Sequence, residues 1–135
     1  MDQAPIPLLD LRAQYDTIRD AVEPAMREVV ESQWFIGGPK LGAFEEAMAD
    51  LCGTEHAVGC ASGSDALLLS LMAVGVGPGD EVICPSFTFF ATAGSIWRLG
   101  ATPVWVDIDP VTFNCTAEGV RQAAARCTSL TAIKP

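Results

Sequence analysis

In the stretch Ala57-Val58-Gly59-Cys60-Ala61-Ser62-Gly63-Ser64-Asp65, the sequence pattern changes from helices alone to strands that alternate with helices. Its apolar start, 57–60, is typical of a buried strand, and the serines and glycine that follow are typical of a turn that opens a helix. The same alternation continues toward the C-terminus. It predicts helices at 66–74, 91–99 and 117–125, and strands at 57–60, 81–84, 103–107 and 130–134. Short strands alternating with helices indicate an α/β fold with a mainly parallel sheet and crossover helices.

The residues before this alternation predict helices only. Over 11–33, apolar side chains recur every three or four residues, which indicates an amphipathic helix that Pro24 kinks or divides in two. A Gly-Pro loop follows at 34–39, and 41–52 predicts a second helix. We therefore expect a helical region at 1–54 and the start of an α/β region at 55–135.

Composition and charge restrict the classes of function. The chain has 135 residues, of which half are hydrophobic, as in globular proteins. A net charge of −9 argues against a surface for nucleic acid or anionic lipid, so an anionic ligand would need backbone amides or one placed cation. The N-terminal residues lack the basic start and apolar run typical of a signal peptide. Five cysteines without Cys-x-x-Cys spacing predict buried thiols in a reducing compartment. We expect a cytoplasmic protein that binds neither nucleic acid nor membrane.

The segment 62–65 is the first candidate site. It joins a predicted strand to a predicted helix, at the sheet edge where α/β proteins bind ligands. Gly63 and the helix start could bind a phosphate through backbone N–H groups. The alternative is that Ser62 or Ser64 simply caps the helix. Asp65 would repel an anion, so its carboxylate should point away from any phosphate bound here.

The segment 85–92 is the second candidate, with three phenylalanines and three hydroxyl side chains at the same edge. One ring could stack on a flat heteroaromatic ligand, and we expect the other two to close the core under the loop. Asp107 and Asp109 are interpreted as turn and cap residues rather than a metal site. His56 has no Ser or Cys partner at a meaningful spacing, so we interpret it as structural.

Taken together, these segments resemble the DegT/StrS-type nucleotide-sugar aminotransferases, which are pyridoxal-phosphate-dependent enzymes of the aspartate-aminotransferase fold (fold type I). The order and spacing of several motifs carry the resemblance: Pro7-Leu8-Leu9-Asp10-Leu11, Trp34-Phe35-Ile36-Gly37-Gly38-Pro39, Ser62-Gly63-Ser64-Asp65-Ala66-Leu67, Pro85-Ser86-Phe87-Thr88-Phe89-Phe90-Ala91-Thr92-Ala93 and Gly100-Ala101-Thr102-Pro103-Val104. The resemblance implies that the chain is the N-terminal part of the large domain of such an enzyme, one domain truncated at Pro135.

The resemblance also implies a cofactor site. Gly63, Ser64 and Asp65 would line the phosphate of pyridoxal 5′-phosphate, mainly through backbone N–H groups and the Ser64 hydroxyl. Phe89 would stack on the pyridine ring.

A substrate site is implied in the loop before the second helix. Phe35, Gly37, Gly38 and Pro39 would border the site of a nucleotide-linked keto-sugar, near the interface of a homodimer. Lys40 stands where the family pattern leads us to expect an acidic residue, which leaves its role open.

The implied reaction transfers an amino group, usually from glutamate, to the keto-sugar, and it requires a lysine that forms a Schiff base. Lys40 and Lys134 are the only lysines in the sequence and neither matches it. We therefore expect no catalytic residue in this chain, because the lysine would lie beyond Pro135. The strand at 57–60 would lack its neighbours, so the polypeptide alone would be inactive and poorly folded.

Two other hypotheses stay open. The chain could be a regulatory protein that binds pyridoxal phosphate or a nucleotide sugar without turnover. It could also be an unrelated anion-binding α/β domain, a reading that depends on the strand–helix pattern alone.

Overall fold

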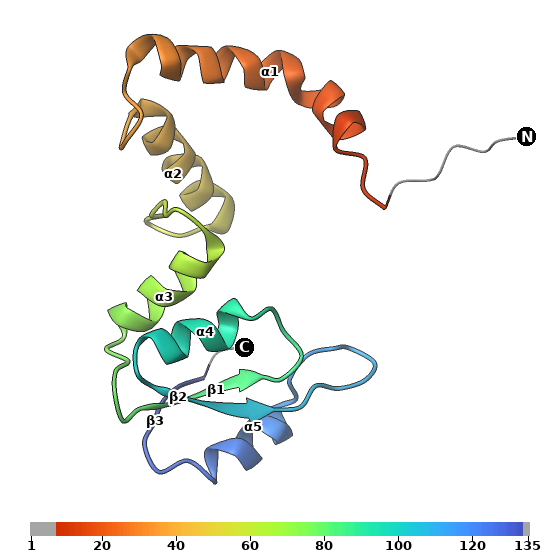
Figure 1. Cartoon of the computed structure of the whole chain (residues 1–135), viewed down its shortest axis with the longest axis vertical. Coiled ribbons are helices and arrows are strands. Elements are labelled where there is room, and N and C mark those ends of the chain that lie inside the picture. The colour runs from red at the N-terminus through yellow and green to blue at the C-terminus, as the bar shows by residue number, and fades with distance from the viewer. Residues whose placement is uncertain (1–7, 134–135) are drawn as a thin grey trace, which may run out of the picture. The chain divides into compact units, whose positions relative to one another are not determined.

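Five helices and three strands make up the part of the chain that the computed structural model describes, residues 8–133, with the backbone alone for 130–133. They fall into two compact units, Met1–Gly59 and Cys60–Pro135. In chain order the elements, labelled in Figure 1, are α1 (Leu11–Ser32), α2 (Pro39–Cys52), α3 (Gly63–Ala73), β1 (Glu81–Pro85), α4 (Ala91–Arg98), β2 (Thr102–Val106), α5 (Ala117–Ala124) and β3 (Leu130–Ile133).

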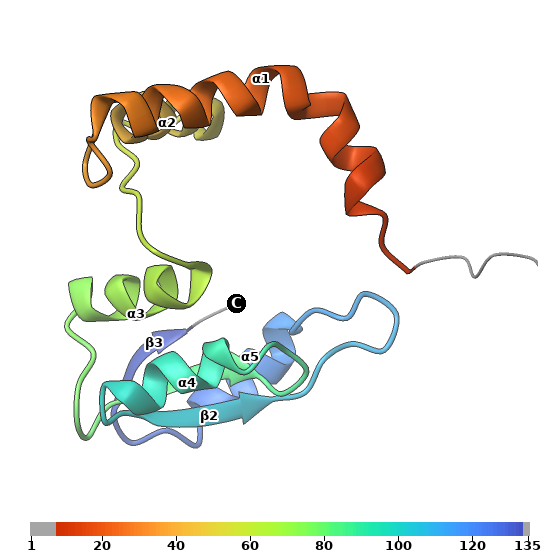
Figure 2. The same cartoon turned by 45° about the horizontal axis from the view of Figure 1, so that its top comes forward.

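The first unit is helical, as predicted. The Asp10 carboxylate caps α1 by accepting the N–H groups of Arg12 and Ala13 at 3.1 and 3.0 Å. Pro24 lies inside one continuous helix, which is bent (Figure 2), as expected where a proline removes a backbone hydrogen bond. α2 begins earlier than predicted because Pro39 occupies its first position, where a missing N–H costs nothing.

The predicted strand at 57–60 is wrong. These residues have no regular secondary structure and pair with no strand among the described residues. The Gly59 N–H donates instead to Glu45 Oε1 at 2.7 Å, and Val58 is 84% exposed. A strand forms only through hydrogen bonds to a neighbour. The apolar run has the composition of a strand but finds no such neighbour within 8–133.

The second unit contains a parallel sheet of order β2-β1-β3, which confirms three of the predicted strands. Ile83 lies opposite Val104 on one side of β1, and Glu81 lies opposite Leu130 on the other. Both ends of each described strand lie within two residues of the predicted ends. Lys134, the predicted end of the last strand, lies outside the described residues.

Helices cover both faces of this sheet (Figure 1). Because successive strand residues point to opposite faces, Val82 and Cys84 pack with Ile96 of α4 on one side, while Ile83 packs with Ala123 of α5 on the other. All five side chains are at most 1% exposed. α3 packs on α4 and adds Leu71 to the first cluster. The carboxyl ends of β1 and β2 thus open onto the loops that precede α4 and α5.

Much apolar surface remains uncovered in the described residues. α1 has no buried residue, and α2 buries only Ala49. The prediction that the cysteines are buried holds for Cys84, but Cys52 and Cys60 are exposed. Both lie outside the two core clusters around the sheet. Every helix within 8–133 is too short or too polar to cross a lipid bilayer.

Glu81 joins β1 to the loop before β3 and should make stability depend on pH. Its Oε2 accepts the N–H groups of Thr128 and Ser129 at 2.6 and 2.7 Å, and hydrogen bonds from Ser129 and then Thr128 lower the pKa of this carboxyl from its ordinary value. A carboxyl whose pKa is lower in the folded state than in the unfolded state stabilises the fold at any pH above its unfolded-state pKa. This stabilisation disappears as the pH falls through the folded-state pKa.

In protein made from the whole reading frame, we therefore expect Glu81→Gln to lower the melting temperature at pH 7, and we expect the difference from wild type to shrink as pH falls. Melting temperatures of both proteins from pH 7 to pH 3 check this expectation. Glu46→Gln is the control, because Glu46 is exposed and its side chain forms no hydrogen bond or ion pair within the described region. An equal difference between wild type and Glu81→Gln at every pH would contradict the assignment.

Candidate functional site

α3 begins directly after Ser62, and this serine is its N-cap. The Ser62 hydroxyl accepts the Asp65 N–H at 3.2 Å and donates to Asp65 Oδ2 at 3.1 Å. Of the two capping alternatives, Ser62 is therefore the cap, and Ser64 lies in the first turn. A helix leaves its first N–H groups without intrahelical acceptors. Those of Gly63 and Ser64 have no recorded acceptor in the part of the chain that the structure describes.

Gly63 leaves open space beside these two N–H groups. It is helical, and a Cβ built on it would meet no atom within 4 Å, so neither conformation nor packing in this unit requires glycine. The space admits a group that approaches the helix start closely. Two N–H donors at the positive end of the helix dipole fit an anion such as a phosphate ester.

A cavity of about 540 Å³ lies beside this helix start. Ser64 lines it from α3 and Phe89 lines it from the loop before α4, so two of the four predicted cofactor residues meet here. Gly63 and Asp65 do not line it. The other lining residues belong to α4 or directly precede it: Phe90, Ala91, Gly94, Ser95, Trp97 and Arg98. Among these described residues, Arg98 is the only charged one.

The three phenylalanines of the loop are all exposed, at 69% for Phe87, 77% for Phe89 and 70% for Phe90. The prediction that two of them close the core is therefore wrong. Side chains of β1 and α4 already complete the core under the loop, so the rings turn outward. Phe87 and Phe90 contact Phe113 and Trp97, with ring centroids 6.2 and 6.3 Å apart. Phe89 has no recorded ring partner in 8–133.

The two carboxylates after β2 have turn roles, as predicted. Asp109 Oδ1 accepts the N–H groups of Val111 and Thr112 at 2.9 and 2.8 Å. Hydrogen bonds from Thr112 and then Val111 lower the pKa of the Asp109 carboxyl. Asp107 accepts the N–H of Ile108. Both side chains are thus engaged with their own loop.

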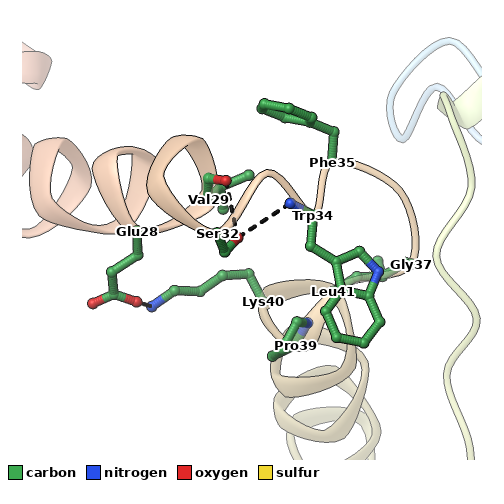
Figure 3. A pocket seen from close by; sticks show the side chains of 10 residues that line it. Glu28, Val29, Ser32, Trp34, Phe35, Gly37, Pro39, Lys40 and Leu41 are labelled. Carbon is green, nitrogen blue, oxygen red and sulfur yellow. Dashed lines mark hydrogen bonds and ion pairs between the residues drawn. The ribbon is translucent and has the colours of Figure 1, made fainter.

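The loop between α1 and α2 borders a second cavity, of about 420 Å³. Phe35, Gly37, Gly38 and Pro39, the four predicted substrate residues, all line it. Gly37 has φ of +62°, and a Cβ on Gly38 would lie 2.9 Å from the carbonyl oxygen of Trp34, so both positions need glycine. The rings of Trp34 and Phe35 lie on opposite sides of the loop (Figure 3).

Lys40 at the start of α2 forms an ion pair with Glu28 of α1, on the wall of this cavity (Figure 3). The sequence pattern gave no sign of this pairing, since the two residues belong to different helices. Half-exposed ion pairs contribute about 0–1 kcal/mol. The family pattern leads us to expect an acidic residue at position 40, and such a residue would be repelled by Glu28. Lys40 is instead attracted to Glu28, so this chain differs from the family pattern at this position.

Comparison with known proteins gives a consistent result. The family model described as the DegT/DnrJ/EryC1/StrS aminotransferase family matches residues 16–135. A pleiotropic regulatory protein of Geobacillus stearothermophilus is 48% identical over 91% of this chain and 33% of its own length. A UDP-N-acetyl-3-dehydro-alpha-D-glucosamine 3-aminotransferase of Acidithiobacillus ferrooxidans is 46% identical over 87% of this chain and 32% of its own.

Solved structures agree with these sequence relatives. DesV of S. venezuelae shares 38% identity and superposes with a TM-score of 0.91, over 97% of this chain and 35% of that one. NtdA of Bacillus subtilis, solved with bound cofactor PMP, shares 29% identity with a TM-score of 0.87, over 98% of this chain and 30% of that one. The chain thus spans about a third of the length of the curated relatives that it matches.

Proposed function

Because the chain belongs to the DegT/DnrJ/EryC1/StrS aminotransferase family, we propose that it is the N-terminal third of an enzyme that transfers an amino group to a nucleotide-linked keto-sugar. Glutamate is the proposed donor, and residues 1–54 and 55–135 are proposed to belong to one domain. The observation that carries the proposal is the cavity that Ser64 and Phe89 share beside the helix start at Gly63.

Pyridoxal 5′-phosphate, when bound, acts as the electron sink for such a transfer. The N–H groups of Gly63 and Ser64 and the Ser64 hydroxyl would hold its phosphate. Phe89 would lie against its ring, because this side chain lines the cavity and has no recorded ring partner in the described residues. The role of these residues is to bind and orient, and none of them transfers a proton in this proposal.

The loop cavity is the proposed place of the sugar nucleotide. Phe35 and Pro39 supply apolar surface, while Gly37 and Gly38 allow the tight turn that brings them together. Lys40 lines this cavity and is already paired with Glu28. A homodimer in the cytoplasm is the proposed setting of the enzyme.

The Schiff-base lysine is proposed to come from residues after Pro135. Lys40 stands in the other unit from Gly63 and Ser64 and is engaged with Glu28, and Lys134 lies outside the described residues. We propose that the 135 residues alone do not catalyse transfer. A regulatory protein that binds the cofactor without turnover is the outcome to be distinguished by experiment.

Replacement of Phe89 tests the proposed function. In protein made from the whole reading frame, Phe89→Ala should weaken pyridoxal phosphate binding about tenfold, since an aromatic contact contributes about 0.5–1.5 kcal/mol beyond its buried area. Phe89→Tyr keeps the ring and should stay near wild type. Binding is measured by fluorescence titration, and transfer by the glutamate-dependent appearance of an aminated nucleotide sugar with an equal amount of 2-oxoglutarate.

Phe87→Ala is the matched control, because Phe87 is as exposed as Phe89 but contacts Phe113 and does not line the cavity. It should leave cofactor affinity unchanged. Cofactor binding without any aminated product, from a panel of nucleotide-linked keto-sugars, would favour the regulatory alternative. Absence of cofactor binding by the wild-type protein would overturn the proposal.

A further inference from the structure

Asp65 and Arg98 are the only charged residues in α3 and α4, and they pair with one another. Arg98 Nη1 lies 3.9 Å from Asp65 Oδ1, which joins the first turn of α3 to the last turn of α4. The loop 86–90 before α4 adds no charge. Within α3, α4 and this loop, Asp65 and Arg98 are therefore the only charged side chains near the first cavity.

The position of Asp65 presents an electrostatic problem for the proposed cofactor. It directly follows Gly63 and Ser64, whose free N–H groups we call the anion cradle. A phosphate ester at the anion cradle carries up to two negative charges, and a carboxylate in the same helix turn repels it. The whole chain, with a net charge of −9, does not relieve this repulsion.

Two contacts hold the Asp65 carboxylate in place. Ser62 Oγ donates to Oδ2 at 3.1 Å, and Arg98 lies next to Oδ1. Asp65 does not line the cavity, whereas Arg98 does. The acid is thus held outside the cavity, and the guanidinium that pairs with it lies on the cavity wall with Ser64 and Phe89.

We infer that Arg98 is a positioning residue for the anion cradle: its pairing with Asp65 keeps that carboxylate out of the cavity where a phosphate binds. The inference depends on the proposed function, because it concerns the same cofactor site. It assigns Arg98 no contact with the reacting atoms. Arg98 therefore acts through Asp65, and its effect should vanish when Asp65 loses its charge.

The test compares two probes on protein made from the whole reading frame. Pyridoxamine 5′-phosphate carries the phosphate and pyridoxamine does not, and neither condenses with a lysine. Arg98→Met should weaken pyridoxamine 5′-phosphate binding about fivefold, as expected for one partly exposed charge pair. Affinity for pyridoxamine should not change. Arg98→Lys should stay close to wild type because it keeps the charge.

The double variant Asp65→Asn/Arg98→Met isolates the coupling. It should bind pyridoxamine 5′-phosphate about as tightly as Asp65→Asn alone, which itself should bind at least as tightly as wild type. Arg121→Met is the matched control, because Arg121 lies on α5, pairs with Glu118 and does not line this cavity. It removes one positive charge and should have no effect on either probe.

Several results would overturn the inference. Arg98→Met could weaken the binding of both probes equally, or it could leave the binding of pyridoxamine 5′-phosphate unchanged. It could also cause the same loss of affinity whether or not Asp65 is replaced by Asn. Weaker binding of pyridoxamine 5′-phosphate by Asp65→Asn than by wild type would also overturn it. Because Asp65→Asn keeps Arg98, this result can be obtained even if Arg98→Met does not fold. A wild-type protein that binds pyridoxamine 5′-phosphate but shows no coupling refutes this inference alone. A wild type that binds neither probe refutes the proposed function as well.

Discussion

Expressed by itself, the 135-residue polypeptide is expected to show no sharp cooperative melting transition and no aminotransferase activity. Its first unit buries almost nothing, since α1 has no buried residue and α2 has only Ala49. Large apolar side chains such as Ile36, at 89%, and Leu51, at 79%, stay exposed. So little burial does not offset the entropy lost when a chain becomes ordered.

The sheet of the second unit gives a second reason for this expectation. β3 pairs with β1 on one side and with no other strand among residues 8–133. Such an edge offers unpaired N–H and C=O groups to other chains, and uncovered apolar helix faces add to the tendency to aggregate.

Calorimetry and size-exclusion chromatography of the 135-residue polypeptide provide the check, with protein from the whole reading frame as the control. The control is expected to melt cooperatively and to bind pyridoxal phosphate. A soluble, monomeric 135-residue sample with a sharp heat-absorption peak would show that the two units are self-sufficient, and the expectation would fail.

Ile96→Ala should be strongly destabilising in protein made from the whole reading frame. Ile96 is 0% exposed and packs against Val82 and Cys84 of β1. Removing a buried isoleucine to alanine costs about 2–5 kcal/mol, since the loss of apolar transfer energy adds to the cost of the cavity that remains. Ile96→Ala should also weaken cofactor binding, because Trp97 and Arg98, which follow Ile96 in α4, line the cavity.

Urea unfolding followed by fluorescence measures this change, with Val111→Ala as the control. Val111 is 82% exposed and lies in the loop between β2 and α5, so shortening it should alter the free energy of unfolding by about 0.5 kcal/mol or less. If both variants lost equal stability, the core that we describe around α4 would be wrong.

The α/β region was predictable because its signals are local. Alternation of apolar runs with helix-forming segments, and the turn before Glu81, place β1, α4, β2 and α5 within two residues of the structure. The apolar run 57–60 has the same local signal and still forms no strand. Strand formation depends on a neighbour, and a strand's composition contains no information about whether a neighbour is present.

The candidate site was predictable only in part. The rule that ligands bind at the carboxyl edge of a parallel sheet points to the segment 85–92, whereas Ser64 and Phe89 were singled out only by the family resemblance. Arg98 does not follow from it, because it reaches the cavity only through the packing of α3 on α4. The Glu28–Lys40 ion pair is equally non-local. The outward rings of Phe87 and Phe90 depend on how full the core beneath them is, which hydrophobicity alone does not reveal.

The central position of β1 has a consequence for how the sheet is assembled during synthesis. Its partner β2 follows after a single helix, whereas β3 follows only after β2 and α5. Ribosomes add about 5–20 residues per second, so β1, α4 and β2 can associate while β3 has yet to be made. The loop closed when β1 pairs with β2 is shorter than the one closed when β1 pairs with β3, so it costs less conformational entropy. The β1–α4–β2 unit is therefore the expected nucleus on which the later strands of the nascent chain are added.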